Sequence, residues 1–540
     1  MKKFAKKMMS LALATVACFT MIFATACGGG GDNSGPTGDN SGYDLRITYF
    51  DGGYGQGWIT EGAKRFEALT GKKVGLIPSS EFDCGADTYL QSGNNVPDIY
   101  IIESSMWKGW VKSGYLEPLD SVYDTEVDTA SGKQKISNFM DQQVKGKYYL
   151  ERKIGNGMMQ PWALPLGATP NAMAYNCDVL EVLPHNGVAL SEEVVSSQTG
   201  LWIAPPRTVS ELKAFIDDVN AYNATIPEGE TKYVPLGWCG KNANILFYAI
   251  YSWWAQAQGY QTSNYEGEGS FADFWNFGNT SSDTRSHTLD TRVFLQSGLQ
   301  FTIDTLIDIL VDEEKDQWKN TLEDVMSISS QDLQKTFVSN SVKVKPVLVF
   351  AASYLESETI KYNYLDSDGD GQRDVNFKFM PVPKLDGYEG KDVVYCSYED
   401  VMVVPQNATN KELAKQFLAF MCNQDNLEMF TKETKGCMRP FNYDARNIQD
   451  GNFSEYTQGV FDLYYNSLHA FEYPINCTNL LSVSNVYRYE RPTFIGNDID
   501  AFVKALKTEN GRKIMTDIYN SINSHDVSTW VKNYRLTVVE

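Results

Sequence analysis

The chain has 540 residues, too many for one hydrophobic core, so at least two domains are expected. Its formal net charge of −21 disfavours binding to nucleic acid or to anionic lipid surfaces. Of nine cysteines, seven lie beyond Cys27 and stand singly, with no C-x-x-C pair. We therefore expect neither a disulfide framework nor a zinc site.

The first 26 residues predict a secretion signal. Four lysines within the first seven residues precede the apolar run Met8–Phe23, which is too short to span a bilayer stably. Ala24-Thr-Ala-Cys27 then matches a lipobox, whose cysteine is acylated on its thiol and becomes the new N-terminus. A plain signal-peptidase site is the alternative. Residues 27–43 are rich in Gly, Ser, Asn and Asp, which predicts a flexible tether.

From Asp44 on, apolar residues alternate with others and predict a strand. A glycine-rich loop at 52–57, a helix that ends at Gly71 and a second strand at 74–77 are expected to follow. This order predicts a mostly parallel sheet covered by helices. The loop lacks the glycine spacing of nucleotide-binding motifs, but its glycines let backbone approach a ligand.

Four further segments carry a recognisable pattern. Pro161–Asp178 contains three prolines before a short apolar strand, which predicts an extended crossing between two bodies. Asn95-Val-Pro-Asp-Ile leads into another strand, and Pro205-Pro-Arg-Thr-Val-Ser-Glu-Leu212 opens a helix with a Thr208-x-x-Glu211 capping box. Residues 409–421 predict a second boxed helix, Thr409-x-x-Glu412. In this order the segments resemble the extracellular solute-binding proteins of carbohydrate importers, the family of maltose-binding protein.

The resemblance implies an α/β fold of the two-lobe periplasmic-binding-protein type (type II), with a mostly parallel, helix-covered sheet in each lobe. The first lobe is expected at 44–166 and 397–443, and the second at 167–396 and 444–540. Hinges are expected at Leu164–Ala168 and Tyr395–Tyr398. The last hundred residues match the family only loosely.

The resemblance also implies a function. The protein is expected to be a monomeric binding lipoprotein of an ABC importer, without enzymatic activity. It would stand on the outer face of a bacterial cytoplasmic membrane, capture an oligosaccharide between its lobes and deliver it to a permease. Sugars need flat aromatic faces for their C–H surfaces and fixed polar groups for their hydroxyls. Loops that relatives aim at the cleft supply the candidates Trp238, Tyr354 and Tyr398 for stacking, and Glu103, Ser105, Thr169, Asn242, Glu399 and Arg439 for hydrogen bonds.

Two other functions stay open. A peptide- or polyamine-binding receptor of the same fold would offer more carboxylates and fewer aromatic residues. A lipid-anchored glycoside hydrolase needs only two carboxylates and shows no readable motif. The four histidines stand alone, so a clustered metal or triad site is not expected.

The segment 366–374 predicts a structural calcium site. Its ligands would be Asp366, Asp368, Asp370, Gln372 and Asp374, around a turn at Gly371. An EF-hand has a bidentate glutamate at position 12, where this chain has Phe377. A solvated acidic turn is the alternative.

Overall fold

The computed structural model describes residues 42–471, except 104–105, 152–158, 276–277, 280–287, 290–295, 313, 316, 368 and 399. The predicted signal, Cys27, most of the tether and the segment 472–540 lie outside the described residues, as do the candidates Ser105, Glu399 and Asp368. Contact clustering separates residues 1–42 from residues 43–540, and everything below concerns the second unit.

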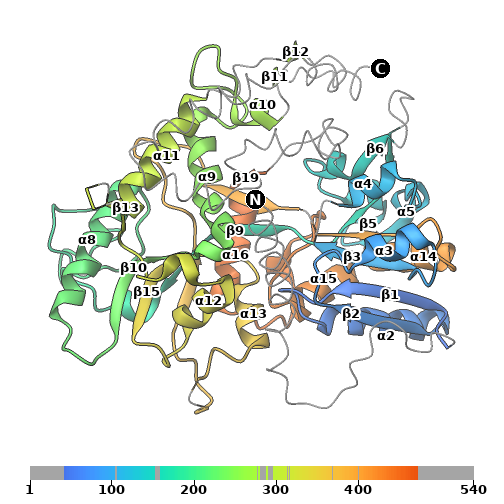
Figure 1. The fold of residues 1–540 in the computed structure, drawn as a ribbon, viewed down its shortest axis with the longest axis horizontal. Helices are drawn as coiled ribbons and strands as arrows, with labels where there is room; N and C mark the ends of the chain where they lie inside the picture. Colours follow the sequence, from blue (N-terminus) through green and yellow to red (C-terminus); the bar gives the residue numbers. More distant parts are fainter. Residues whose placement is uncertain are drawn as a thin grey trace, which may run out of the picture. The chain divides into compact units, whose positions relative to one another are not determined.

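Two sheets organise the described chain, and we name the lobes after them (Figure 1). The sheet of the first lobe has the spatial order β2 (Val74–Ser79), β1 (Leu45–Phe50), β3 (Ile99–Glu103), β18 (Asp400–Val403) and β8 (Leu164–Pro165). The sheet of the second lobe has the order β10 (Lys232–Gly237), β15 (Val344–Ala352), β9 (Thr169–Asn176), β17 (Val393–Ser397) and β19 (Leu468–Ala470), with β16 (Phe377–Met380) also paired to β9.

The strand directions differ between the two sheets. In the first lobe β1 is parallel to both β2 and β3, as predicted, and β18 and β8 add antiparallel pairs. In the second lobe β9 is antiparallel to β15, β16 and β17, while β10 pairs with β15 and β17 with β19 in parallel. The second sheet is therefore mixed, because the crossing strand β9 runs opposite to its neighbours.

Helices pack on both sheets (Figure 1), and α15 contacts α2 and α14 contacts α5, although these partners are far apart in sequence. The first lobe carries α2 (Gly57–Thr70), α3 (Ala86–Ser92), α4 (Trp107–Lys112), α5 (Asp120–Tyr123), α6 (Ile136–Phe139), α14 (Lys411–Phe420) and α15 (Gln424–Glu433). The second carries α7 (Cys177–Leu180), α8 (Val209–Thr225), α9 (Phe247–Gln258), α10 (Phe271–Trp275), α11 (Ser297–Leu310), α12 (Ser330–Val338), α13 (Leu355–Lys361) and α16 (Glu455–Asn466).

Short elements complete the described chain. The two-stranded pairs are β4 (Glu126–Thr129) with β5 (Gly132–Lys135), β6 (Tyr149–Glu151) with β7 (Met159–Pro161), β11 (Gly278–Asn279) with β12 (Thr288–Leu289), and β13 (Val311–Asp312) with β14 (Gln317–Trp318). The 3-10 turns are η1 (Lys145–Tyr148), η2 (Gly240–Leu246), η4 (Val325–Ser327) and η5 (Ala445–Asn447).

Helix caps confirm one sequence prediction and correct another. Thr208 and Glu211 form the predicted capping box of α8, with both hydrogen bonds at 3.2 Å. The predicted box at Thr409 is wrong, because α14 begins at Lys411 and Asn410 occupies the N-cap position. Tertiary contacts determine this start: the Asn410 backbone N–H donates to Asp98 Oδ1 at 2.9 Å.

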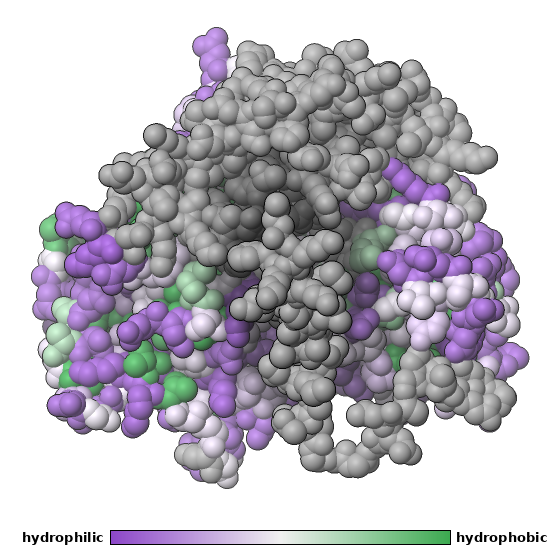
Figure 2. All heavy atoms as spheres, in the orientation of Figure 1, coloured by the Kyte–Doolittle hydropathy of each residue, from purple (hydrophilic) through white to green (hydrophobic). Residues whose placement is uncertain are grey.

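Cysteines of the described chain are free and buried: Cys84, Cys177, Cys239, Cys396, Cys422 and Cys437. Hydrophilic residues dominate the part of the surface in Figure 2 that is not drawn grey, with hydrophobic residues scattered among them. In the described residues, no helix combines the length and the apolar character needed to cross a bilayer.

Candidate functional site

The chain passes between the two sheets twice, and candidate polar groups gather at these crossings. The first crossing joins β8 to β9, and the second joins β17 to β18. They are held together by backbone, since the Leu166 N–H donates to the Asp400 carbonyl at 2.8 Å. The residues at strand ends on either side of these crossings can therefore face one space from both lobes.

Tyr54 links both crossings from the loop after β1. Its hydroxyl donates to Asp400 Oδ2 at the start of β18 and lies 3.2 Å from Thr169 Oγ1 at the start of β9. A Cβ atom on Gly167 would lie 1.9 Å from the Tyr54 hydroxyl oxygen, so the phenol occupies space that only glycine leaves free. Thr169, a predicted site residue, is thus brought to the first-lobe loop, although its side chain is largely buried.

Tyr354 and Glu103 approach the same region from opposite lobes. Tyr354 is the N-cap of α13, directly after β15, and Glu103 is the exposed last residue of β3. The nearby Tyr248 hydroxyl, burial and the carboxylates Glu358 and Glu103 together raise the pKa of Tyr354 well above its usual range. Burial raises the pKa of Tyr248, with Glu103 again acting in the same direction. Both phenols therefore stay neutral hydrogen-bonding groups at any physiological pH.

A cluster of aromatic rings continues from Tyr354 toward the second crossing. The ring centre of Tyr248 in α9 lies 6.2 Å from that of Tyr395 in β17. The ring centre of Tyr251 lies 4.7 Å from that of Tyr395, at an interplanar angle of 86°. We call Glu103, Tyr248, Tyr354 and Tyr395 the interlobe cluster. It combines aromatic rings, hydroxyls and one carboxylate, the groups that a polyhydroxylated ligand requires.

The structure places three other predicted site residues in packing or capping roles. The Trp238 ring is fully buried and packs edge-on against Trp318 at 4.8 Å. Asn242 Oδ1 accepts the backbone N–H of Ser330 at 3.0 Å. Tyr398 is buried, and its hydroxyl lies 2.9 Å from His469 Nδ1. Their ligand roles remain predictions, and in this arrangement none of the three belongs to the interlobe cluster.

Arg439 also has its two terminal nitrogens engaged inside the protein, whereas its buried Nε has no hydrogen-bond partner among the described residues. It is 1% exposed, and its two terminal nitrogens donate to the carbonyls of Met421 at 2.5 Å and Pro165 at 2.9 Å. The guanidinium lies 5.0 Å from the centre of the Phe441 ring. Arg439 therefore ties the loop after α15 to β8 at the first crossing.

Tyr248, Tyr395 and Tyr54 were not among the predicted contacts. Aromatic residues at helical spacing in 245–257 suggest core packing, and most of α9 is indeed buried. A usable signal was present nonetheless, because Tyr248 and Tyr251 place hydroxyls three residues apart in the otherwise apolar start of this helix, residues 247–251.

The segment 366–374 forms a compact turn. Asp366 Oδ1 accepts the N–H groups of Gly369 at 2.8 Å and Asp370 at 3.0 Å, and Oδ2 accepts that of Gly371 at 3.0 Å. The Asp374 carboxylate accepts hydrogen bonds from the backbone N–H and the hydroxyl of Ser367 and from the Asn340 N–H. In the described part of the chain no three His, Cys, Asp or Glu side chains are grouped for a metal. Calcium binding thus remains a prediction.

A known protein family matches most of this chain. The model of the family "Bacterial extracellular solute-binding protein" matches residues 52–427, well over half of the chain. The chain belongs to this family. No protein with curated function matches it by sequence.

Solved structures share the fold of this solute-binding protein. A chitin oligosaccharide binding protein is 11% identical, with a TM-score of 0.58, over 90% of this chain and 100% of that one. RafE in complex with raffinose is 14% identical, with a TM-score of 0.54, over 89% of this chain and 99% of that one. Maltose-bound MalE3 of T. maritima is 16% identical, with a TM-score of 0.52, over 89% of this chain and 99% of that one. At these identities the likeness establishes the two-lobe fold.

Proposed function

We propose that this solute-binding protein is the carbohydrate receptor of an ABC importer. It would be anchored through Cys27, bind an oligosaccharide between its lobes and hand it to a membrane permease. The observation that carries the proposal is the interlobe cluster, where the Tyr354 ring of the second lobe lies against Gly53 of the first and Tyr248 lies beside Tyr395. Solved relatives named for chitin oligosaccharide, raffinose and maltose support the ligand class.

The physical argument concerns which ligands gain from such a cluster. A sugar ring can stack its C–H face on a phenol and offer hydroxyls to the carboxylate and to the tyrosine hydroxyls. Because the groups come from both lobes, the ligand makes all its contacts only when the lobes are together. It therefore favours the closed state, which a permease can distinguish from the open one.

Calorimetry and thermal shift with glucan, xylan and mannan oligomers test the proposal. A saccharide at a hundred times its dissociation constant should stabilise the fold by about 2.7 kcal/mol. Tyr354→Ala should weaken binding by about 1–3 kcal/mol, the scale of one buried aromatic side chain. Tyr222→Ala, on α8, is the matched control and should bind as the wild type does. Binding of peptides or polyamines in place of any saccharide would refute the carbohydrate assignment.

A further inference from the structure

Helix α13 presents one face to the first lobe. Tyr354, Ser357 and Lys361 are spaced by three and four residues, so they lie on the same side of this short helix. Ser357 Oγ donates to the Gly53 carbonyl at 2.6 Å. Lys361 Nζ lies 3.0 Å from both Asp51 Oδ1 and the Asp51 carbonyl. We call Asp51, Gly53, Tyr354, Ser357 and Lys361 the clasp.

The first-lobe side of the clasp is held in place by its own lobe. Gln56 Nε2 donates to Asp51 Oδ2 at 2.8 Å, which leaves Oδ1 for Lys361. The Asp51 N–H donates to the Ser79 carbonyl at the end of β2 at 2.8 Å. Gly53 admits the Tyr354 ring at close range, since a Cβ atom there would lie 2.9 Å from Tyr354 Cγ.

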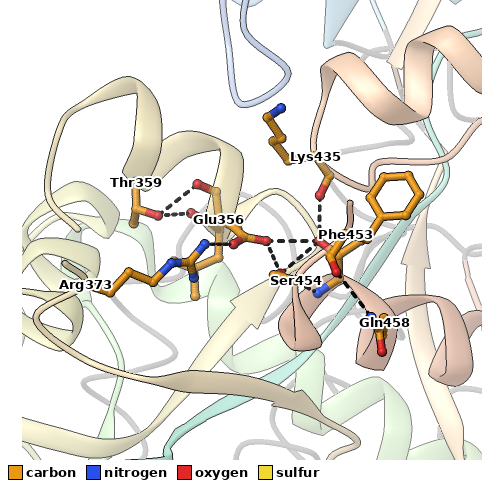
Figure 3. Close-up of polar contacts among 9 residues, drawn as sticks. Glu356, Thr359, Arg373, Lys435, Phe453, Ser454 and Gln458 are labelled. Atoms are coloured by element: carbon orange, nitrogen blue, oxygen red, sulfur yellow. Dashed lines mark hydrogen bonds and ion pairs between the residues drawn. The ribbon is translucent and has the colours of Figure 1, made fainter. Parts of the chain in front are cut away.

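The opposite side of α13 is fixed to the second lobe, as Figure 3 shows around Glu356. This carboxylate is 3% exposed, pairs with Arg373 and accepts hydrogen bonds from Ser454 Oγ at 2.5 Å and Thr457 Oγ1 at 3.0 Å at the N-terminus of α16. Glu358 lies on the same side of the helix as the clasp, and there Gln334 of α12, also in the second lobe, donates to it at 2.5 Å. The helix therefore moves with the second lobe, and the clasp contacts connect two separately supported bodies.

We infer that the clasp stabilises the closed arrangement of the lobes without help from solute, and so sets the fraction of solute-free receptor that is closed. Its biological meaning rests on the proposed function, because Tyr354 belongs both to the clasp and to the interlobe cluster. The side chains of Lys361 and Asp51 are 28% and 21% exposed, so water and salt screen their attraction only in part. Such a contact can shift an equilibrium between lobes without locking it.

Single-molecule FRET on the solute-free protein measures the ratio of open to closed molecules directly. Dyes attached through non-natural amino acids at exposed positions Leu69 of the first lobe and Val188 of the second avoid the native cysteines. Lys361→Glu should raise the open-to-closed ratio by about two- to tenfold, because it turns attraction to Asp51 into repulsion. Asp51→Lys should do the same, and the double variant with exchanged charges should return the ratio toward that of the wild type.

Lys343→Glu is the matched control, with the same change of charge on an exposed lysine of the second lobe. An unchanged ratio in Lys361→Glu, an equal shift in Lys343→Glu, or no recovery in the exchanged pair would each overturn the inference. The FRET experiment uses no saccharide, so its failure is distinct from failure of the carbohydrate proposal in calorimetry.

Discussion

Arg439 is a cation enclosed in protein, with carbonyl oxygens as its hydrogen-bond partners. Arg439→Ala removes two charge-assisted hydrogen bonds and leaves the carbonyls of Met421 and Pro165 without this donor. The free energy of unfolding should fall by about 3 kcal/mol. Arg207→Ala removes an exposed surface pair with Glu193 and should cost less than about 1 kcal/mol. Urea denaturation measures both; an Arg439→Ala protein of normal stability that fails to bind solute would instead support the ligand role.

His185 makes stability depend on pH. Its Nδ1 lies 2.7 Å from Asp218 Oδ2 and its Nε2 lies 2.9 Å from the Val188 carbonyl, so both ring nitrogens face acceptors. Burial acts to lower the pKa of His185, but these acceptors outweigh burial and raise it above its usual value. A raised folded-state pKa stabilises the protein below the unfolded pKa, and this contribution is lost as pH rises through the folded one.

His185→Asn should therefore be less stable than the wild type by about 1.5–3 kcal/mol near pH 5.5, the scale of hydrogen bonds to a charged group. The difference should shrink as pH rises toward about 8.5. Melting curves of both proteins across this range provide the measurement. A difference that does not change with pH would mean that folding leaves the pKa of His185 unshifted.

At the residue scale, sequence predicted the site only in part. Glu103 and Tyr354 follow strand ends, and such positions can be located from strand patterns alone. Trp238 also follows a strand, but the partner that buries it, Trp318, comes from β14, about eighty positions later. No local pattern contains that contact. The roles of Tyr54 and Gly53 were equally hidden, because their partners lie on other elements, 115 or more residues away.

At the element scale, two threonines provide a matched test of helix capping. Thr208 accepts the Glu211 N–H in the capping box of α8, so Thr208→Ala should lower the free energy of unfolding by about 1 kcal/mol. Thr409 precedes the N-cap of α14 and should tolerate alanine. Chemical denaturation of the two variants distinguishes them. Equal losses would place Thr409 back in a capping role.

The same pair shows what sequence decides about elements. Both segments match the capping-box spacing, and only one forms it. The difference comes from Asn410, whose amide donates to the Asp44 carbonyl at 2.7 Å and whose backbone is held by Asp98. Strands and helix α2 were predictable because periodicity is local, whereas the start of α14 depends on residues more than three hundred positions away.

The melting temperature with and without calcium tests the prediction that the turn at 366–374 binds Ca²⁺. If the turn binds Ca²⁺ through its aspartates, calcium at a hundred times its dissociation constant should stabilise the protein by about 2.7 kcal/mol, and a chelator should reverse this. Asp370→Asn should weaken the effect, whereas Asp128→Asn on the exposed hairpin β4–β5 should leave it intact. A melting temperature insensitive to calcium and to chelator would favour the solvated acidic turn.

At the scale of the whole molecule, the lipobox at Cys27 predicts where the protein resides. Acyl chains contribute about 0.8 kcal/mol per buried CH₂, so two or more chains would hold it stably on a membrane. Cys27→Ala should release the protein, and mass spectrometry of the wild type should find the acyl groups. Wild-type protein that is unacylated and free in the medium would exclude the anchor.

The position of β18 has a consequence for how the molecule is made. This strand pairs with β3 and β8, yet nearly three hundred residues separate it from β3, and most of the second lobe lies between. The first lobe therefore cannot complete its sheet until β18, which ends at Val403, has been synthesised. Until then β3 keeps an open edge, the kind of surface on which chains aggregate. Long-range pairing of this kind slows folding, and the second lobe depends on still later segments, since α16 and β19 follow β18 in the chain.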